Sequence, residues 1–244
     1  MENLVESALP ALFVLPVLAV ALAASGSRRT GSAALLFLLL LTLDGFLVSA
    51  PVVYDVAQVP GANWNWTGKA LSLAWALAFI GFGPLSRRDV GLTVRQRPNS
   101  LRPAVLVTVG LVLLGVTIGA VFGGGGPLRV ETLAYQLTMP GLAEELAFRG
   151  VFLALLHRAI PAEAGAAVSW WPAVVTTLAF AFTHSPSLEG GRIAFAFLPF
   201  LLPLVAGAAF AWLREKTGSL LWPTIAHNGL NAAIFVSGSV AGAA

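Results

Sequence analysis

The apolar run GLAEELAFR, residues 141–149, contains three ionisable residues within six positions: Glu144, Glu145 and Arg149. Charged groups in a lipid-buried helix are costly, so they are functional candidates by default. Glu145 and Arg149 are four residues apart, share a helix face and can form an ion pair. Glu144 points about a quarter-turn away, and we expect it to lack such a partner. A desolvated, unpaired carboxylate can exchange protons near neutral pH, as a general acid or base must. The alternative is a purely structural ion-pair cluster.

Two of the three histidines also lie within apolar runs. The stretch TLAFAFTH ends at His184, and the stretch IAHNGLN contains His227 and Asn231 one helical turn apart. A lone histidine in an apolar helix is usually a packing residue with one satisfied hydrogen bond. The third histidine, His157, sits at a loop beside Arg158, and we expect it to be only interfacial. A glutamate, two histidines and an asparagine on separate helices could together activate water and stabilise an oxyanion.

The composition predicts an all-α, polytopic integral membrane protein. Hydrophobic residues make up 57% of the chain and charged residues only 10%, against about 25% charged in soluble domains. Within lipid, an open strand would leave its backbone hydrogen-bonding groups unpaired, so we expect each spanning segment to be a helix. There are no cysteines, which excludes disulfides and thiolate ligands. The arginines of this basic chain lie mainly between the apolar runs, so we expect contact with the lipid bilayer and no nucleic acid partner.

Eight apolar segments approach the roughly 20 residues that cross a bilayer, and we expect about eight transmembrane helices. They are 8–24, 32–50, 66–84, 103–122, 131–156, 168–184, 193–213 and 219–240. We interpret 1–244 as a single membrane domain, with 131–240 as the catalytic helices and the helices of 1–122 without an assigned role. Asp44, a lone acid in the second segment, is interpreted as a buried, hydrogen-bonded residue or as one near a kink.

Basic residues predict the orientation of these segments. Alternate connections contain ten of the 14 Lys and Arg residues: Arg28, Arg29, Arg87, Arg88, Arg95, Arg97, Arg102, Arg158, Arg214 and Lys216. By the positive-inside rule these connections face the cytoplasm and both termini face outward. We expect the plasma (inner) membrane as the location.

The motifs EExxxR, FxxxH and HxxxN follow one another in this order, with the flanks AEELAFRG and TGSLLWPTIAHNGLN. Together they resemble the CAAX protease and bacteriocin-processing family (CPBP, also called ABI) of integral membrane endopeptidases. The resemblance covers residues 131–235. It implies hydrolysis of a peptide bond in a membrane-associated protein or peptide. Glu144 and His184 would then activate the attacking water, and His227 and Asn231 would hold the oxyanion.

The resemblance also implies that Glu145 and Arg149 hold their helix in register. It leaves the catalytic type open between glutamate-dependent hydrolysis and a metalloprotease. In the second case, Glu144, His184 and His227 could bind Zn²⁺ with water as the fourth ligand. The sequence lacks the His-Glu-x-x-His helix that would make a zinc assignment firm.

Two functions from other classes compete with the peptidase. A family member can be non-proteolytic, acting in bacteriocin self-immunity or as a membrane scaffold. A transporter could use Glu144, Glu145 and the histidines as a proton relay, but it predicts paired discontinuous helices in both halves. Here the polar groups lie in one half, so the transporter ranks last.

Overall fold

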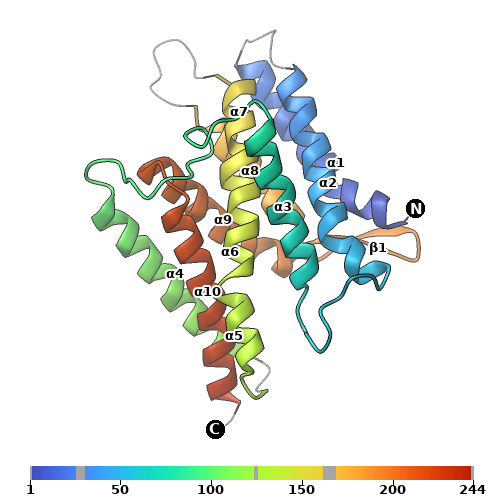
Figure 1. Ribbon diagram of the computed structural model, residues 1–244, viewed down its shortest axis with the longest axis vertical. Coiled ribbons are helices and arrows are strands. Elements are labelled where there is room, and N and C mark those ends of the chain that lie inside the picture. The colour runs from blue at the N-terminus through green and yellow to red at the C-terminus, as the bar shows by residue number, and fades with distance from the viewer. Residues whose placement is uncertain (1, 26–30, 124–125, 162–168, 243–244) are drawn as a thin grey trace.

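The computed structural model describes residues 2–25, 31–123, 126–161 and 169–242. The regular secondary structure of these residues is helical apart from one short hairpin (Figure 1), which confirms the all-α class. In chain order the elements are α1 (Glu2–Ala24), α2 (Gly31–Val53), α3 (Trp66–Phe82), α4 (Leu101–Phe122), α5 (Val130–Gln136), α6 (Met139–Glu145), the π-helix η1 (Leu146–Phe152), α7 (Leu153–Ala159), α8 (Trp171–Phe182), β1 (Pro186–Glu189), β2 (Arg192–Phe195), α9 (Phe197–Thr217) and α10 (Leu221–Ala241).

Four of the described helices are long and apolar enough to cross a membrane: α1, α2, α4 and α9, of 21 to 23 residues each. The chain is thus an integral membrane protein. The expected count of eight spans is not confirmed, since α3 and α8 have only 17 and 12 residues. Length and composition therefore identify four candidate spans, half of the expected number.

The connection between α3 and α4 and the ends of α7 and α9 lie at one end of the molecule, opposite the C-terminus (Figure 1). We call it the basic end, because it includes Arg87, Arg88, Arg95, Arg97, Arg102, Arg158, Arg214 and Lys216. Arg28 and Arg29 lie outside the described residues. That this end faces the cytoplasm stays a prediction.

The segment 131–156, expected as one continuous helix, is broken into α5, α6, η1 and α7. The break at Leu137 and Thr138 precedes Pro140, which occupies the first turn of α6. Proline lacks the N–H that would continue the preceding helix, and its ring clashes with the carbonyl four residues earlier. The π-helix η1 begins directly after Glu145, and its turns are wider than those of an α-helix. Such π-helical turns frequently occur at functional sites.

The expected helices at 168–184 and 193–213 are also modified, because α8 ends at Phe182 and an antiparallel β1–β2 hairpin follows. Its turn is formed by Gly190 and Gly191, both with positive φ (58° and 75°), which glycine adopts without a steric penalty. As a result β2 occupies the residues where a helix beginning at 193 was expected.

Two hydrophobic cores meet beside the predicted site residues. The larger joins α1 and α2 to η1, α7 and α8 and includes Phe180; the second joins α4, α9 and α10 and includes Phe210. His227 contacts both, stacked on Phe210 at 4.8 Å between ring centres and edge-on to Phe180 at 5.9 Å. The site is therefore held at the junction of two packed units.

Candidate active site

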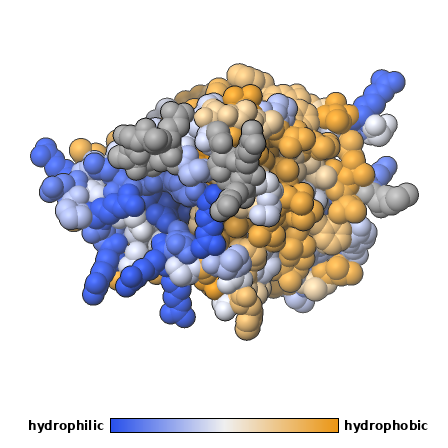
Figure 2. Space-filling model, turned by 90° about the horizontal axis from the view of Figure 1, so that it is seen from above, coloured by the Kyte–Doolittle hydropathy of each residue, from blue (hydrophilic) through white to orange (hydrophobic). Residues whose placement is uncertain are grey.

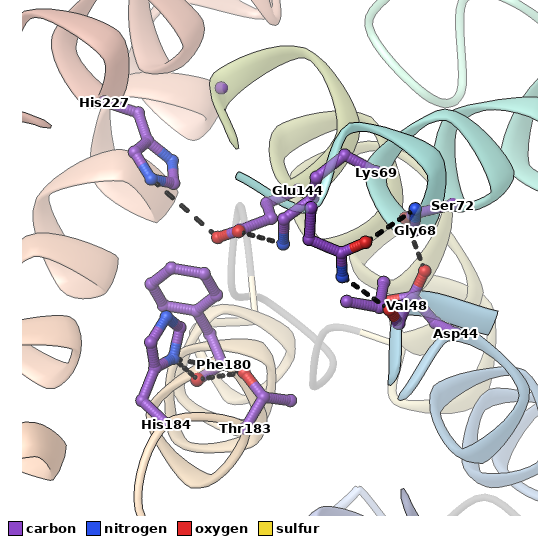
Figure 3. A network of polar contacts seen from close by, with 12 residues as sticks. Asp44, Val48, Gly68, Lys69, Ser72, Glu144, Phe180, Thr183, His184 and His227 are labelled. Atoms are coloured by element: carbon purple, nitrogen blue, oxygen red, sulfur yellow. Dashed lines mark hydrogen bonds and ion pairs between the residues drawn. The ribbon is translucent and has the colours of Figure 1, made fainter. Parts of the chain in front are cut away.

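A cavity of about 320 Å³ brings together the four predicted catalytic residues, Glu144, His184, His227 and Asn231. They come from α6, from the turn after α8, and from α10. Phe180 packs edge-on between the imidazoles, with its ring centre 4.8 Å from His184 and 5.9 Å from His227 (Figure 3). The cavity thus combines a carboxylate, two imidazoles and an amide against an aromatic wall.

Glu144 was expected to be an unpaired acid, and this is wrong. Its Oε1 accepts a hydrogen bond from Lys69 Nζ of α3 at 2.5 Å, in a pair whose side chains are only 13% and 15% exposed (Figure 3). The other oxygen, Oε2, lies 3.8 Å from His227 Nε2. Oε2 is buried and has no hydrogen-bond partner in the described part of the chain. One oxygen is therefore fixed, and the other is free for a ligand.

Lys69 reaches Glu144 because the start of α3 is fixed closely against α2. The Asn65 side chain caps α3 by accepting from Gly68 N at 2.9 Å, and it donates to the carbonyl of Val48 on α2 at 2.6 Å. A Cβ at residue 68 would lie 2.2 Å from that carbonyl oxygen, so this approach requires glycine. The cap and the close approach together direct the next residue, Lys69, toward α6.

Asp44 stabilises the same helix from α2. It is 5% exposed, and its Oδ1 accepts from Ser72 Oγ at 2.5 Å and from Trp75 Nε1 at 2.7 Å. Ser72 lies one turn after Lys69 on α3. The interpretation of Asp44 as a buried, hydrogen-bonded residue is confirmed, and its effect is to fix the rotation of α3.

One carboxylate oxygen of Glu145, Oε1, contacts two partners, Arg149 and His227. Arg149 Nη1 donates to Oε1 at 3.1 Å, and both side chains are fully buried. His227 Nδ1 lies 2.8 Å from the same Oε1. Arg149 also donates to the carbonyl of Gly207 at 3.0 Å and lies over the ring of Phe180 at 4.3 Å. Glu145 therefore positions an imidazole as well as its own helix.

The hydrogen bonds fix which ring nitrogen of each histidine faces the cavity. Because Arg149 can only donate to Glu145, that oxygen acts as an acceptor, and His227 Nδ1 carries a proton toward it. The carbonyl of Phe180 can likewise only accept, so His184 Nδ1, at 2.9 Å, is the donor there. Both imidazoles consequently turn Nε2 toward the reacting region.

Asn228 holds α6 against α10. Its Oδ1 accepts from Gly141 N at 2.8 Å, and its Nδ2 donates to the carbonyl of Thr138 at 3.3 Å. A Cβ at residue 141 would lie 2.5 Å from Asn228 Oδ1. Glu144 lies one turn after Gly141, and His227 immediately precedes Asn228. The clamp therefore sets the distance between the carboxylate and the imidazole.

Sequence reasoning missed both Lys69 and Asn228. The signal for Lys69 was available, because a lone cation within an apolar segment needs a counter-ion, and Glu144 was the acid left without one. Asn228 stands within the motif that contained His227 and Asn231. Its adjacent position in the helix directs it toward a different neighbour, which the spacing alone did not reveal.

The proposed zinc ligands do not fit a metal site. Among the described residues, no group of three His, Cys, Asp or Glu side chains is arranged to hold a metal ion. Glu144, His184 and His227 share the cavity, but the ammonium of Lys69 already occupies one oxygen of the carboxylate. The metalloprotease assignment is therefore not supported by this donor geometry.

Comparison with known proteins bears on the C-terminal half of the chain. Residues 126–233 match a family model described as Type II CAAX prenyl endopeptidase Rce1-like. No curated protein and no solved structure matches the chain. The matched segment contains all four predicted catalytic residues as well as Glu145 and Arg149. The resemblance of the motifs to the CAAX protease (CPBP) family is thereby confirmed over this segment.

Proposed function

We propose that this protein is an intramembrane endopeptidase that uses Glu144 to activate water against a peptide bond of a membrane-associated protein or peptide. One observation carries the proposal: the unpartnered Oε2 of Glu144 lies 3.8 Å from His227 Nε2, in a cavity that His184 and Asn231 also line. A general base needs a free oxygen within hydrogen-bond reach of its water, and Glu144 Oε2 meets this requirement.

In the first step, Glu144 Oε2 takes one proton from water while the water oxygen attacks the carbonyl carbon. His184 Nε2, whose partner nitrogen donates to the carbonyl of Phe180, accepts the second hydrogen bond of the water and orients it. Lys69 holds the other oxygen of Glu144, so that Oε2 stays directed into the cavity. Lys69 is thus a positioning residue.

In the tetrahedral intermediate, negative charge develops on the former carbonyl oxygen. The Asn231 amide and His227 Nε2–H donate to this oxyanion, and a donor of this kind is worth about 2.7–4 kcal/mol at the transition state. His227 Nδ1–H is held by Glu145, so Nε2 donates only when the ring carries both protons. Glu144 then returns its proton to the leaving nitrogen, the C–N bond breaks, and a carboxylic acid and an amine result.

This mechanism extends across both halves of the chain, which we treat as one membrane domain in the plasma (inner) membrane. The helices of 131–240 supply the base, the imidazoles and the oxyanion donors. The helices of 1–122, which had no assigned role, supply Lys69 through α3 and the Asp44 support through α2. The N-terminal helices then take part in the site directly.

The test is cleavage of a membrane-peptide library by the purified protein, analysed by mass spectrometry. We expect Glu144→Gln to lower the rate by roughly 10²–10⁴, while Glu189→Gln, at an exposed acid on the hairpin, cleaves like the wild type. Cleavage by Glu144→Gln at the wild-type rate would refute the mechanism. Loss of activity with a chelator would favour a metal instead. If the wild type cleaves no peptide, the immunity or scaffold function replaces the peptidase.

A further inference from the structure

A second cavity, of about 570 Å³, opens at the basic end. It lies between the 84–100 connection, α7 and the end of α9, and its described lining shares no residue with the active-site cavity. Four arginines line it: Arg88, Arg95, Arg97 and Arg214. Viewed from above, hydrophilic residues gather on one side of this end, beside a hydrophobic side (Figure 2). We call this cavity the arginine pocket.

Two of these arginines are anchored by neutral groups. Arg214 is 8% exposed, and its Nη2 donates to the backbone carbonyl of Asp89 at 2.9 Å. Its Nε is buried without a hydrogen-bond partner among the described residues. Arg97 Nη1 donates to the backbone carbonyl of Glu215. Carbonyl oxygens fix the direction of a guanidinium but do not cancel its charge.

The two acids of the pocket are engaged by other partners. The Asp89 carboxylate accepts from Ser86 N at 2.8 Å, from Ser86 Oγ at 2.9 Å and from Arg158 at 3.1 Å. The Glu215 carboxylate lies 2.6 Å from His157 Nε2. Within the described ranges, none of the four arginines of the pocket forms an ion pair. The lining therefore holds four guanidiniums against two carboxylates, so the protein compensates its positive charge only in part.

We infer that the arginine pocket binds a phosphate group. Guanidinium groups bind phosphate oxygens through paired, charge-assisted hydrogen bonds, and the pocket combines buried and exposed guanidiniums. Leu153 and Ala154 of α7 provide an apolar part of its lining. The pocket lies where the helices end at the charged face, the level at which basic residues attract anionic phospholipids. The phosphate could come from such a headgroup or from a soluble phosphate compound.

Binding is measured on the purified full-length protein in a neutral detergent, as the rise in unfolding temperature with added ligand. The probes are dioctanoyl phosphatidylglycerol, glycerol phosphate, inorganic phosphate and dioctanoylglycerol. A response to the first probe alone identifies a lipid headgroup, and an equal response to the first three identifies a soluble phosphate. Dioctanoylglycerol, which lacks the phosphate, should give no shift.

The decisive variant is Arg88→Gln/Arg95→Gln, which removes two exposed guanidiniums of the pocket and leaves its buried anchor intact. The matched control is Arg87→Gln/Arg102→Gln, which removes equal charge from exposed positions of the same region outside the pocket lining. We expect at least about tenfold weaker binding for the pocket variant, a loss of about 1.4 kcal/mol, and less than threefold for the control. Equal losses in both variants, or a wild type that responds to none of the phosphate probes, would overturn the inference.

Discussion

The active site and the arginine pocket are both rich in charge, but they compensate it differently. In the active site each cation faces a carboxylate of the protein: Lys69 contacts Glu144, and Arg149 contacts Glu145. In the arginine pocket, Arg97 and Arg214 are held by backbone carbonyls. Charges that are neutralised internally are fixed in place and suit chemistry on a neutral peptide bond. Positive charges that the protein compensates only in part favour an anion from outside.

The two adjacent glutamates show the same contrast at closer range. Glu145 is completely buried, and its Oε1 receives both Arg149 and His227. Glu144 is 13% exposed at its side chain and keeps Oε2 free toward the cavity. One carboxylate is therefore expected to contribute mainly to stability and the other mainly to rate. The following predictions test this division and the contacts on which it depends.

The largest loss of stability is expected from Glu145→Gln. Removing one member of a buried ion pair leaves the Arg149 guanidinium without compensation, at a cost of about 3–5 kcal/mol. The unfolding temperature of the purified variant should fall well below that of Glu144→Gln. The double variant Glu145→Gln/Arg149→Met should recover part of the loss, because no buried charge is then left alone. An unfolding temperature equal to that of the wild type would contradict the assigned role of Glu145.

A second prediction concerns Lys69→Met. Without the ammonium, Glu144 loses the contact that directs Oε2 into the cavity, and we expect kcat to fall roughly 10- to 100-fold with little change in KM. Lys69→Arg should restore part of the rate, since it supplies a cation at the same position. Lys216→Met, at an exposed lysine of the basic end, serves as the control. A change confined to KM would assign Lys69 to substrate binding instead.

The clamp between α6 and α10 is tested by Gly141→Ala. The added methyl group would meet Asn228 Oδ1 at 2.5 Å, and relieving this contact moves Glu144 away from His227. We expect a loss of stability of about 1–3 kcal/mol and an activity loss of about tenfold or more. Gly110→Ala is the matched control, because a Cβ there meets nothing within 4 Å. Equal effects of the two substitutions on activity would show that the clamp does not set the site geometry.

The smallest effect is expected at Asp89. The backbone N–H of Ser86, aided by the Ser86 hydroxyl and Arg158, holds the pKa of Asp89 below its usual value of 3.8. The ionised Asp89 carboxylate thus stabilises the folded protein at pH values above its usual pKa. This contribution is lost as the pH falls through the lowered pKa of the folded state. The unfolding temperatures of wild type and Asp89→Asn should differ slightly at pH 6 and converge toward pH 2. A difference that persists at low pH would assign the effect to packing.

Sequence patterns predicted the polar residues of the site better than the helices that position them. Glu144, His184, His227 and Asn231 stood out because polar groups are rare in apolar helices, and the structure places all four at one cavity. The break before Pro140 was missed, since an apolar run of sufficient length reads as one helix.

The contacts that reach across the fold were the least accessible from sequence. Lys69 lies 75 residues before Glu144, and no local spacing connects them. The β1–β2 hairpin replaced part of an expected helix, although the Gly190–Gly191 turn that permits it was visible in the sequence. Local periodicity reports burial well, whereas long-range pairing depends on how the helices pack.

The most direct test of water activation by Glu144 is a single turnover in H₂¹⁸O, with enzyme in excess over a peptide that the library identifies as a substrate. If Glu144 acts as a base, the water oxygen enters the new carboxylate directly, and every product molecule carries one ¹⁸O. If Glu144 attacks the carbonyl itself, an anhydride forms, and product released by attack of water on the glutamate carbon carries an unlabelled enzyme oxygen. We predict complete labelling in the first turnover; unlabelled product would contradict the mechanism.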